Sequence, residues 1–257
     1  MAETAVRVNA DPDVLAQSAA ARLVVRLMDA QAERGLASIV LTGGRIADRI
    51  YQAVRDSPAR DAVDWRRVDV WWGDERFLPA GHADRNEAQA RAALLDALPL
   101  DPARVHPMPA SDGPAGAEPE AAAAQYADEL AASARPGTAR LPHFDLLLLG
   151  VGADGHVASV FPEHPAAYET RPVAGVRGSP KPPANRITLT LPAINTAEEV
   201  WLIAAGPEKA GIVGMALTSN AGPVQLPAAG VHGVERTLWL LDRAAAAEVP
   251  AGHRSLR

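Results

Sequence analysis

The chain has 257 residues, 48% of them hydrophobic, and 31 acidic against 25 basic residues give it a net charge of −6. It has no cysteine, which excludes disulfides, thiolate catalysis and zinc–thiolate sites. We find no basic run of the kind that binds nucleic acid, no apolar run near the ~20 residues of a membrane span, and no secretory signal. We therefore expect a cytoplasmic protein that binds neither nucleic acid nor membrane.

Helix and strand patterns alternate along the chain. The expected helices carry apolar residues at i+4 spacing or begin at a capping residue or proline. They cover residues 11–35, 45–56, 85–98 and 118–134 and a segment that begins at Pro207. The expected strands are short apolar or alternating runs at residues 38–41, 68–72, 146–149, 186–191, 199–206 and 237–242. This alternation predicts an α/β fold, with a mostly parallel sheet between helices on both faces. No composition break divides the chain, so we expect one domain over residues 1–257.

The turn between the first expected strand and its helix contains Thr42, Gly43 and Gly44. Such a turn offers backbone N–H groups and a helix N-terminus to an anion, most often a phosphate. Arg45 can add a forked, charged contact. Glycines also occur in many α/β turns for geometry alone, so this signal is weak by itself.

A second group of polar residues follows the strand at 68–72. Asp74, Glu75 and Arg76 arrive together at its carboxyl end, where open α/β sheets bind their ligands. The alternative is a solvated loop in which a carboxylate pairs with Arg76.

The central stretch runs from Asp145 to Pro162. Four consecutive leucines at 146–149 are typical of a strand buried on both faces of a parallel sheet. A glycine-rich turn that includes Gly152 follows at once and leads to Asp154 and His156. Glycine lets backbone N–H groups approach a ligand, and histidine moves protons near neutral pH. We take this turn as the reacting centre.

Lys209 lies in the first turn of the helix that begins at Pro207. A cation there opposes the helix dipole. An anion shared between the lysine and the free N–H groups would remove the conflict.

Several chemistries lack their motifs. The chain has no G-x-S-x-G elbow and no G-x-x-x-x-G-K-[ST] phosphate loop. GVGADG at 150–155 has dinucleotide-loop spacing but lacks a clear following helix and a ribose-binding acid. The histidines show no metal-binding spacing on one element, so we expect neither a metal nor a cofactor. The remaining groups suit general acid–base catalysis on a small phosphorylated substrate.

Four blocks of the sequence resemble the 6-phosphogluconolactonase family, and the resemblance covers nearly the whole chain. They are WWGDERFLPAGHADRN (71–86), LLLLGVGADGHVASVFP (146–162), SPKPPANRITLTLPAIN (179–195) and GPEKA (206–210). The resemblance implies the Rossmann-like three-layer sandwich of phosphosugar isomerases and lactonases. A further segment departs from the family pattern: Thr42-Gly43-Gly44-Arg45 stands where the family often has S-G-G-S. Arg45 therefore either replaces hydroxyl contacts to phosphate or points away. Because no long amphipathic seam stands out, we expect a monomer.

The resemblance also implies an activity, the hydrolysis of 6-phospho-D-glucono-1,5-lactone to 6-phosphogluconate in the oxidative pentose phosphate pathway. His156 would be the general base for water, and Arg76 or loop N–H groups would meet the oxyanion. Asp154 or Asp74 would orient the imidazole or the water. The residues expected to bind substrate or its phosphate are Thr42, Gly43, Gly44, Arg45, Asn86, Gly152, Arg177, Lys181 and Lys209.

Two alternatives stay open. A glucosamine-6-phosphate deaminase would use the same fold, with Asp74 as base and His156 opening the ring. A non-catalytic sugar-phosphate sensor would bind the ligand without turnover, but it would be expected to carry a partner domain and to lose the histidine.

Overall fold

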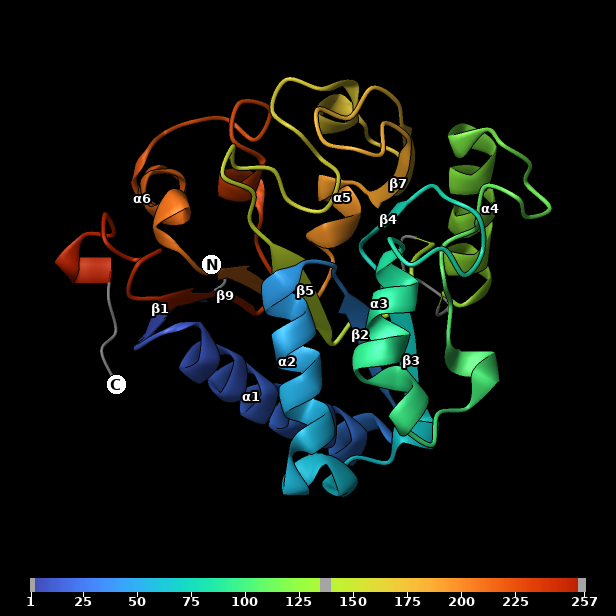
Figure 1. Cartoon of the computed structure of the whole chain (residues 1–257), viewed down its shortest axis with the longest axis horizontal. Coiled ribbons are helices and arrows are strands. Elements are labelled where there is room, and N and C mark those ends of the chain that lie inside the picture. The colour runs from blue at the N-terminus through green and yellow to red at the C-terminus, as the bar shows by residue number, and fades with distance from the viewer. Residues whose placement is uncertain (1–2, 135–139, 254–257) are drawn as a thin grey trace.

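The computed structural model of the chain describes residues 3–134 and 140–253. Its larger sheet has six strands, all paired in parallel, in the order β1-β9-β8-β5-β2-β3 (Figure 1). A smaller antiparallel sheet has the order β4-β7-β6. The strands are β1 (Glu3–Asn9), β2 (Ala37–Leu41), β3 (Val68–Trp72), β4 (Asp74–Arg76), β5 (Leu146–Gly150), β6 (Val173–Val176), β7 (Arg186–Leu189), β8 (Glu199–Ala204) and β9 (Arg236–Asp242).

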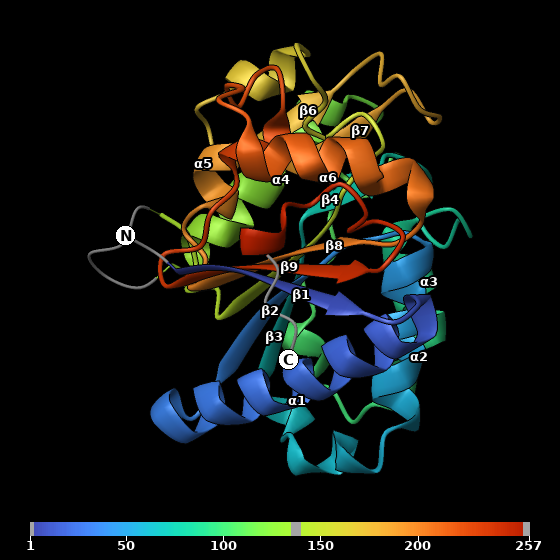
Figure 2. The same cartoon turned by 90° about the vertical axis from the view of Figure 1, so that its left-hand side faces the viewer.

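Helices cover both faces of the large sheet. Figure 2 shows α1 and α2 on one side, and α4, α5, α6 and the small sheet on the other. The helices are α1 (Pro12–Arg34), α2 (Arg45–Asp56), α3 (Asn86–Ala93), α4 (Pro119–Ala132), α5 (Leu191–Ile194) and α6 (Ala210–Thr218). Short 3-10 helices lie at Pro58–Ala62, Trp65–Arg67, Leu95–Ala97, Pro102–Arg104, Pro165–Tyr168, Pro207–Lys209, Pro227–Gly230 and Ala251–His253. The predicted α/β class, with a mostly parallel sheet and helices on both faces, is confirmed.

The first helix shows why the sequence patterns were informative. The side chain of Asp11 accepts hydrogen bonds from the N–H groups of Asp13 (3.0 Å) and Val14 (2.8 Å), which satisfies the helix N-terminus. Gly35 ends α1 in the left-handed region, at φ 71°. The apolar stripe between these ends is buried against the sheet and α2.

The order of the strands creates the crevice in which a ligand can bind. From β2 the chain passes through α2 to β3 on one side, whereas from β5 it reaches β8 on the other side. Because β2 and β5 are neighbours, the loops that leave them diverge at a topological switch point. The turn at 42–44 and the turn at 150–156 are these two loops.

Three strands were not predicted. β1 pairs with β9 at the edge of the large sheet, and its polar residues hide its period. β4 and β6 are three and four residues long, too short to show a pattern. The element after Pro207 begins as a 3-10 turn before α6. Within the described ranges, no helix combines the length and the apolarity that crossing a membrane requires.

Candidate active site

A cleft of about 680 Å³ opens above the switch point, at the carboxyl ends of β2, β5 and β8. It brings together most of the residues that the sequence nominated from distant segments. Those that line it are Thr42, Gly43, Gly44, Arg45, Asp74, Arg76, Asn86, Gly152, His156, Lys181 and Lys209.

His156 has two charged neighbours on one side of its ring. Its Nδ1 forms a hydrogen bond with the carboxylate of Asp154. The ammonium of Lys181 lies 3.3 Å from Nδ1 and 3.6 Å from the same carboxylate oxygen. With Nδ1–H donated to Asp154, Nε2 carries the lone pair and can take a proton. The arrangement therefore holds the imidazole of His156 in one orientation in the cleft.

Asp154 stays ionised in this environment. Burial alone would raise the pKa of the carboxyl group, but the hydrogen bond and charge of His156, together with Lys181, hold it well below its usual range. Asp154 is thus a permanent anion beside the imidazole, able to orient it and to stabilise its protonated form.

The absence of a side chain at Gly152 leaves room for the imidazole of His156. A Cβ atom at this position would lie 1.9 Å from His156 Nδ1 and 2.4 Å from Asp154 Oδ1. Any other residue would therefore displace the pair. The N–H of Gly152 donates to the His156 carbonyl at 2.9 Å, which closes the turn.

Hydrogen bonds to Tyr51 of α2 hold the turn after β2 in place. The hydroxyl of Tyr51 accepts from the N–H of Thr42 (3.0 Å) and donates to its carbonyl (2.7 Å). Gly44 has φ 111° and precedes α2, whose N-terminus has no side-chain cap. Uncapped N–H groups at a helix start suit an anion. This supports the predicted phosphate site but does not test it.

Asp74 is less free than its nomination as a catalytic group implies. It is buried and accepts from the hydroxyl of Ser159 (2.7 Å) and from the amide of Asn86 (3.4 Å). Asn86 also donates to the Asp74 carbonyl at 2.8 Å, and its amide packs where a side chain on Gly43 would stand. Asp74 and Asn86 thus join β4, α3 and the loop after His156.

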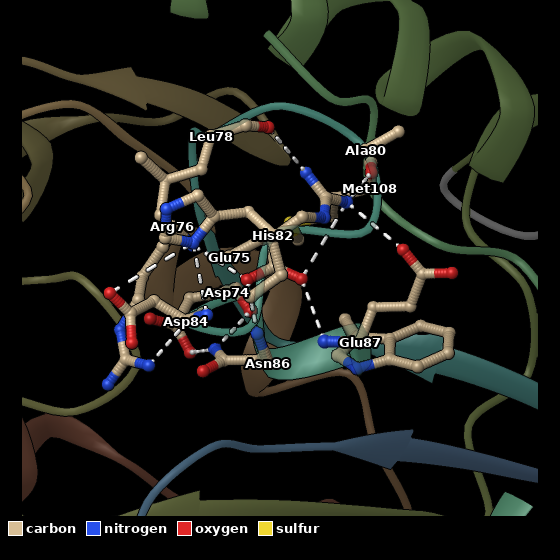
Figure 3. A network of polar contacts seen from close by, with 12 residues as sticks. Asp74, Glu75, Arg76, Leu78, Ala80, His82, Asp84, Asn86, Glu87 and Met108 are labelled. Carbon is tan, nitrogen blue, oxygen red and sulfur yellow. Dashed lines mark hydrogen bonds and ion pairs between the residues drawn. The ribbon is translucent and has the colours of Figure 1, made fainter. Parts of the chain in front are cut away.

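Glu75 belongs to the network of polar contacts around Asp74 and Asn86 that Figure 3 shows. Its fully buried carboxylate accepts from the N–H groups of Arg76 (2.8 Å), Asn86 (2.6 Å) and Glu87 (2.9 Å), and so caps α3 from outside the helix. Arg85 lies 3.7 Å away. Burial raises the pKa of Glu75 to about 7, although Arg85 and these three N–H groups favour the carboxylate.

Cations around the cleft are only partly neutralised. In the described part of the chain, Arg45, Arg76 and Lys209 form no salt bridge, although Arg76 donates to the carbonyl of Asp84 at 2.5 Å. Burial, and then the nearby charge of Lys181, lower the pKa of Lys209. The cleft is a locally positive region of a protein whose net charge is −6.

Two arginines differ from the expectation. Arg177 does not line the cleft: its guanidinium pairs with Glu118 and Glu120 at the start of α4, so we leave it out of the proposed site. Arg186 lines the cleft but was not nominated. As the first residue of an alternating strand it gave only a structural signal, although it lies inside the block from 179 to 195.

A cluster at the amino ends of β5 and β8 contains residues of types that can bind a metal ion. Ligand atoms of His143, Asp145 and Glu198 all lie within 4.8 Å of one another. Arg26 and Arg34 form salt bridges to the same two carboxylates. Their positive charges already neutralise the cluster, so its chemistry fits an ion-pair network better than a cation site.

Comparisons with known proteins agree with this geometry. The family described as Glucosamine-6-phosphate isomerases/6-phosphogluconolactonase matches residues 10–239. The chain belongs to this family. A protein of Streptomyces coelicolor named 6-phosphogluconolactonase is 61% identical over 95% of this chain and 94% of its own length. A 6-phosphogluconolactonase of Mycobacterium tuberculosis is 47% identical over 96% and 99%. The solved 6-phosphogluconolactonase of Trypanosoma brucei superposes with a TM-score of 0.82 at 29% identity, covering 97% of this chain and all of that one.

Proposed function

We propose that the chain hydrolyses 6-phospho-D-glucono-1,5-lactone to 6-phospho-D-gluconate, with His156 as the base. The observation that carries the mechanism is the Asp154–His156 pair, because its imidazole lines the same cleft as an anion-suited turn and cations without a salt bridge in the described residues. The activity itself is supported by family membership and by relatives that bear the name of this enzyme.

The reaction needs no covalent nucleophile, because a lactone carbonyl is already activated. His156 Nε2 takes a proton from a water molecule as its oxygen bonds to the lactone carbon. The negative charge that forms on the carbonyl oxygen faces Arg76 or the N–H groups of the glycine-rich turn. The ring C–O bond then breaks, His156 returns the proton to the leaving ring oxygen, and the new acid ionises.

We assign phosphate recognition to the turn after β2 and to the cations next to it in the cleft. The N–H groups at Gly43 and Gly44 line the cleft together with Arg45 and Lys209. Lys181 lies beside Asp154 and His156, and its charge also acts on Lys209. Asp74 and Asn86 also line the cleft, and the amide of Asn86 donates to the Asp74 carboxylate.

We also propose that residues 1–257 form one domain that works as a cytoplasmic monomer without a cofactor. One cluster of buried apolar side chains includes residues of both sheets, which supports the single domain. Light scattering after size exclusion tests the oligomeric state, since a monomer has a mass of 26.9 kDa.

The decisive experiment measures the initial rate of lactone hydrolysis, with substrate generated in situ and the spontaneous rate subtracted. Wild type should be far faster than background, and His156→Ala should lose about 10²–10⁴-fold of the enzymatic rate. Full activity in the variant would refute the role of His156. A wild type no faster than background would refute the lactonase activity, and ammonia release from glucosamine 6-phosphate would then support a deaminase.

A further inference from the structure

Arg186 occupies an unfavourable place for a cation. It begins β7 directly opposite Arg76 of β4 in the antiparallel pair. Like charges opposite each other destabilise a sheet. The side chain of Arg186 is also only 10% exposed. Burial, and then the charge of Arg76, lower its pKa, whereas Asp74 acts in the opposite direction. Something in the surroundings must compensate for a charge placed here.

Three consecutive carbonyl groups of one loop meet the guanidinium. Nη2 donates to the carbonyls of Pro182 (2.9 Å) and Lys181 (3.1 Å), and Nε donates to that of Pro183 (3.3 Å). Nη1 lies 4.0 Å from Asp74 Oδ2. A planar fork of donors can hold several acceptors at fixed angles, which the ammonium of a lysine cannot do.

The loop held in this way carries the cation that flanks His156. Pro182 and Lys181 themselves are exposed, so the buried Arg186 anchors them from the protein side. Lys181 then reaches back to His156 and Asp154. Arg186 also lies over the ring of Phe161, 5.9 Å from its centroid, and that ring packs 4.6 Å from the imidazole of His156.

We propose that Arg186 is a positioning residue that acts through Lys181: it fixes the loop at 181–183 and so holds Lys181 against the Asp154–His156 pair. The inference rests on the proposed role of His156. Nε and Nη2 of Arg186 donate to carbonyl groups of the protein, so the contribution of the residue is the geometry of the base and of the lysine beside it.

The test uses Arg186→Lys, which keeps the charge and removes the fork. A small displacement of catalytic groups costs up to about 10²-fold, so we expect kcat to fall about 10- to 100-fold while KM stays within about twofold. Arg177→Lys is the matched control, because Arg177 follows the neighbouring strand β6 and pairs outside the cleft. It should leave kcat and KM unchanged.

Dependence on Lys181 is measured with a double-mutant cycle. If Arg186 acts through Lys181, then Arg186→Lys combined with Lys181→Ala should be no slower than Lys181→Ala alone. Losses that multiply would overturn the proposal. So would an unchanged kcat in Arg186→Lys, or a raised KM at unchanged kcat, which would make Arg186 a substrate ligand.

Two further measurements keep the result interpretable. If Arg186→Lys does not fold, Arg186→Gln replaces it, since its amide can still donate to one carbonyl without a buried charge. A folded Arg186→Gln with wild-type kcat would overturn the proposal, and a reduced kcat that Lys181→Ala makes no worse would support it. A wild type without lactonase activity would count against the proposed function instead, so the two failures are distinguishable.

Discussion

Charged side chains gather at both ends of the neighbouring strands β5 and β8, and they are partnered in opposite ways. At the amino ends, Arg26 and Arg34 pair with Asp145 and Glu198. The imidazole of His143 lies 3.3 Å from Asp145 and 2.9 Å from Glu198. Each cation there meets carboxylates of the protein itself.

At the carboxyl ends of the same strands the cations have fewer partners. Among the described residues, Arg45, Arg76 and Lys209 line the cleft without a salt bridge. Keeping cations together with few counter-charges costs stability, and a bound anion would offset that cost. We infer that the paired charges hold the fold and that the cations of the cleft bind the substrate. Mutations at the two ends should therefore affect different measurements.

The largest effect on folding is expected from Asp145→Asn. The side chain of Asp145 is only 2% exposed, and it also accepts from the N–H of Ser38 at 2.7 Å. Removing its charge takes away the buried carboxylate that Arg26 and Arg34 share and leaves them with Glu198. Breaking a buried pair typically costs about 3–5 kcal/mol. We expect urea unfolding to show a loss of this size, while kcat/KM of the folded variant stays at the wild-type value.

Asp61→Asn is the control for this variant. Asp61 pairs with Arg60 at 3.1 Å, but its side chain is 80% exposed. An exposed pair contributes about 0–1 kcal/mol. Equal losses of stability in the two variants, or a fall in kcat/KM of folded Asp145→Asn, would break the distinction between the two ends.

The next largest effect is expected from Lys209→Ala, at the opposite end. Hydrogen bonds to charged groups contribute about 1.5–3 kcal/mol, so kcat/KM for the phosphorylated lactone should fall about 10- to 100-fold, mainly through KM. The free energy of unfolding should not fall, because the variant removes a half-buried cation that lacks a salt-bridge partner in the described structure.

A substrate without phosphate supplies the control for Lys209. Hydrolysis of glucono-1,5-lactone should be slow with wild type and change little in Lys209→Ala, since the contact that is lost does not exist there. An unchanged KM for the phosphorylated substrate would show that Lys209 is not a phosphate ligand.

Sequence patterns predicted the residues that line the cleft better than the residues that hold those residues in place. The leucines of β5 and the polar turn after them are contiguous, so strand, turn and His156 could be read locally. The sequence could not show which of Arg177 and Arg186 lines the cleft. The direction of a proline-rich loop depends on which distant carboxylates and carbonyls it meets: α4 captures Arg177, whereas Arg186 folds back onto its own loop. The anchoring role of Glu75 likewise depends on the approach of α3.

Glu75 is a buried carboxylate, like those at the amino ends of the strands, but it lies next to residues that line the cleft. Folding raises its pKa from 4.5 to about 7, mainly through burial. A carboxyl group with a raised pKa contributes stability that is complete below pH 4.5 and is lost as the pH rises through 7. The stability of wild type should therefore fall, relative to Glu75→Gln, by up to about 1.4 kcal/mol per pH unit between pH 5 and 7.

The prediction concerns how the free energy of unfolding changes with pH, and not its absolute value. Glutamine offers one carbonyl oxygen to the N–H groups of Arg76, Asn86 and Glu87, so Glu75→Gln should be less stable than wild type at pH 5. The difference should narrow toward pH 7 as wild type loses the contribution of the neutral acid. Glu235→Gln, at an exposed position, should give a curve parallel to that of wild type. If the curve of Glu75→Gln is also parallel to that of wild type, Arg85 and the three N–H groups keep Glu75 ionised. Glu75 would then resemble the fully paired carboxylates at the amino ends of β5 and β8.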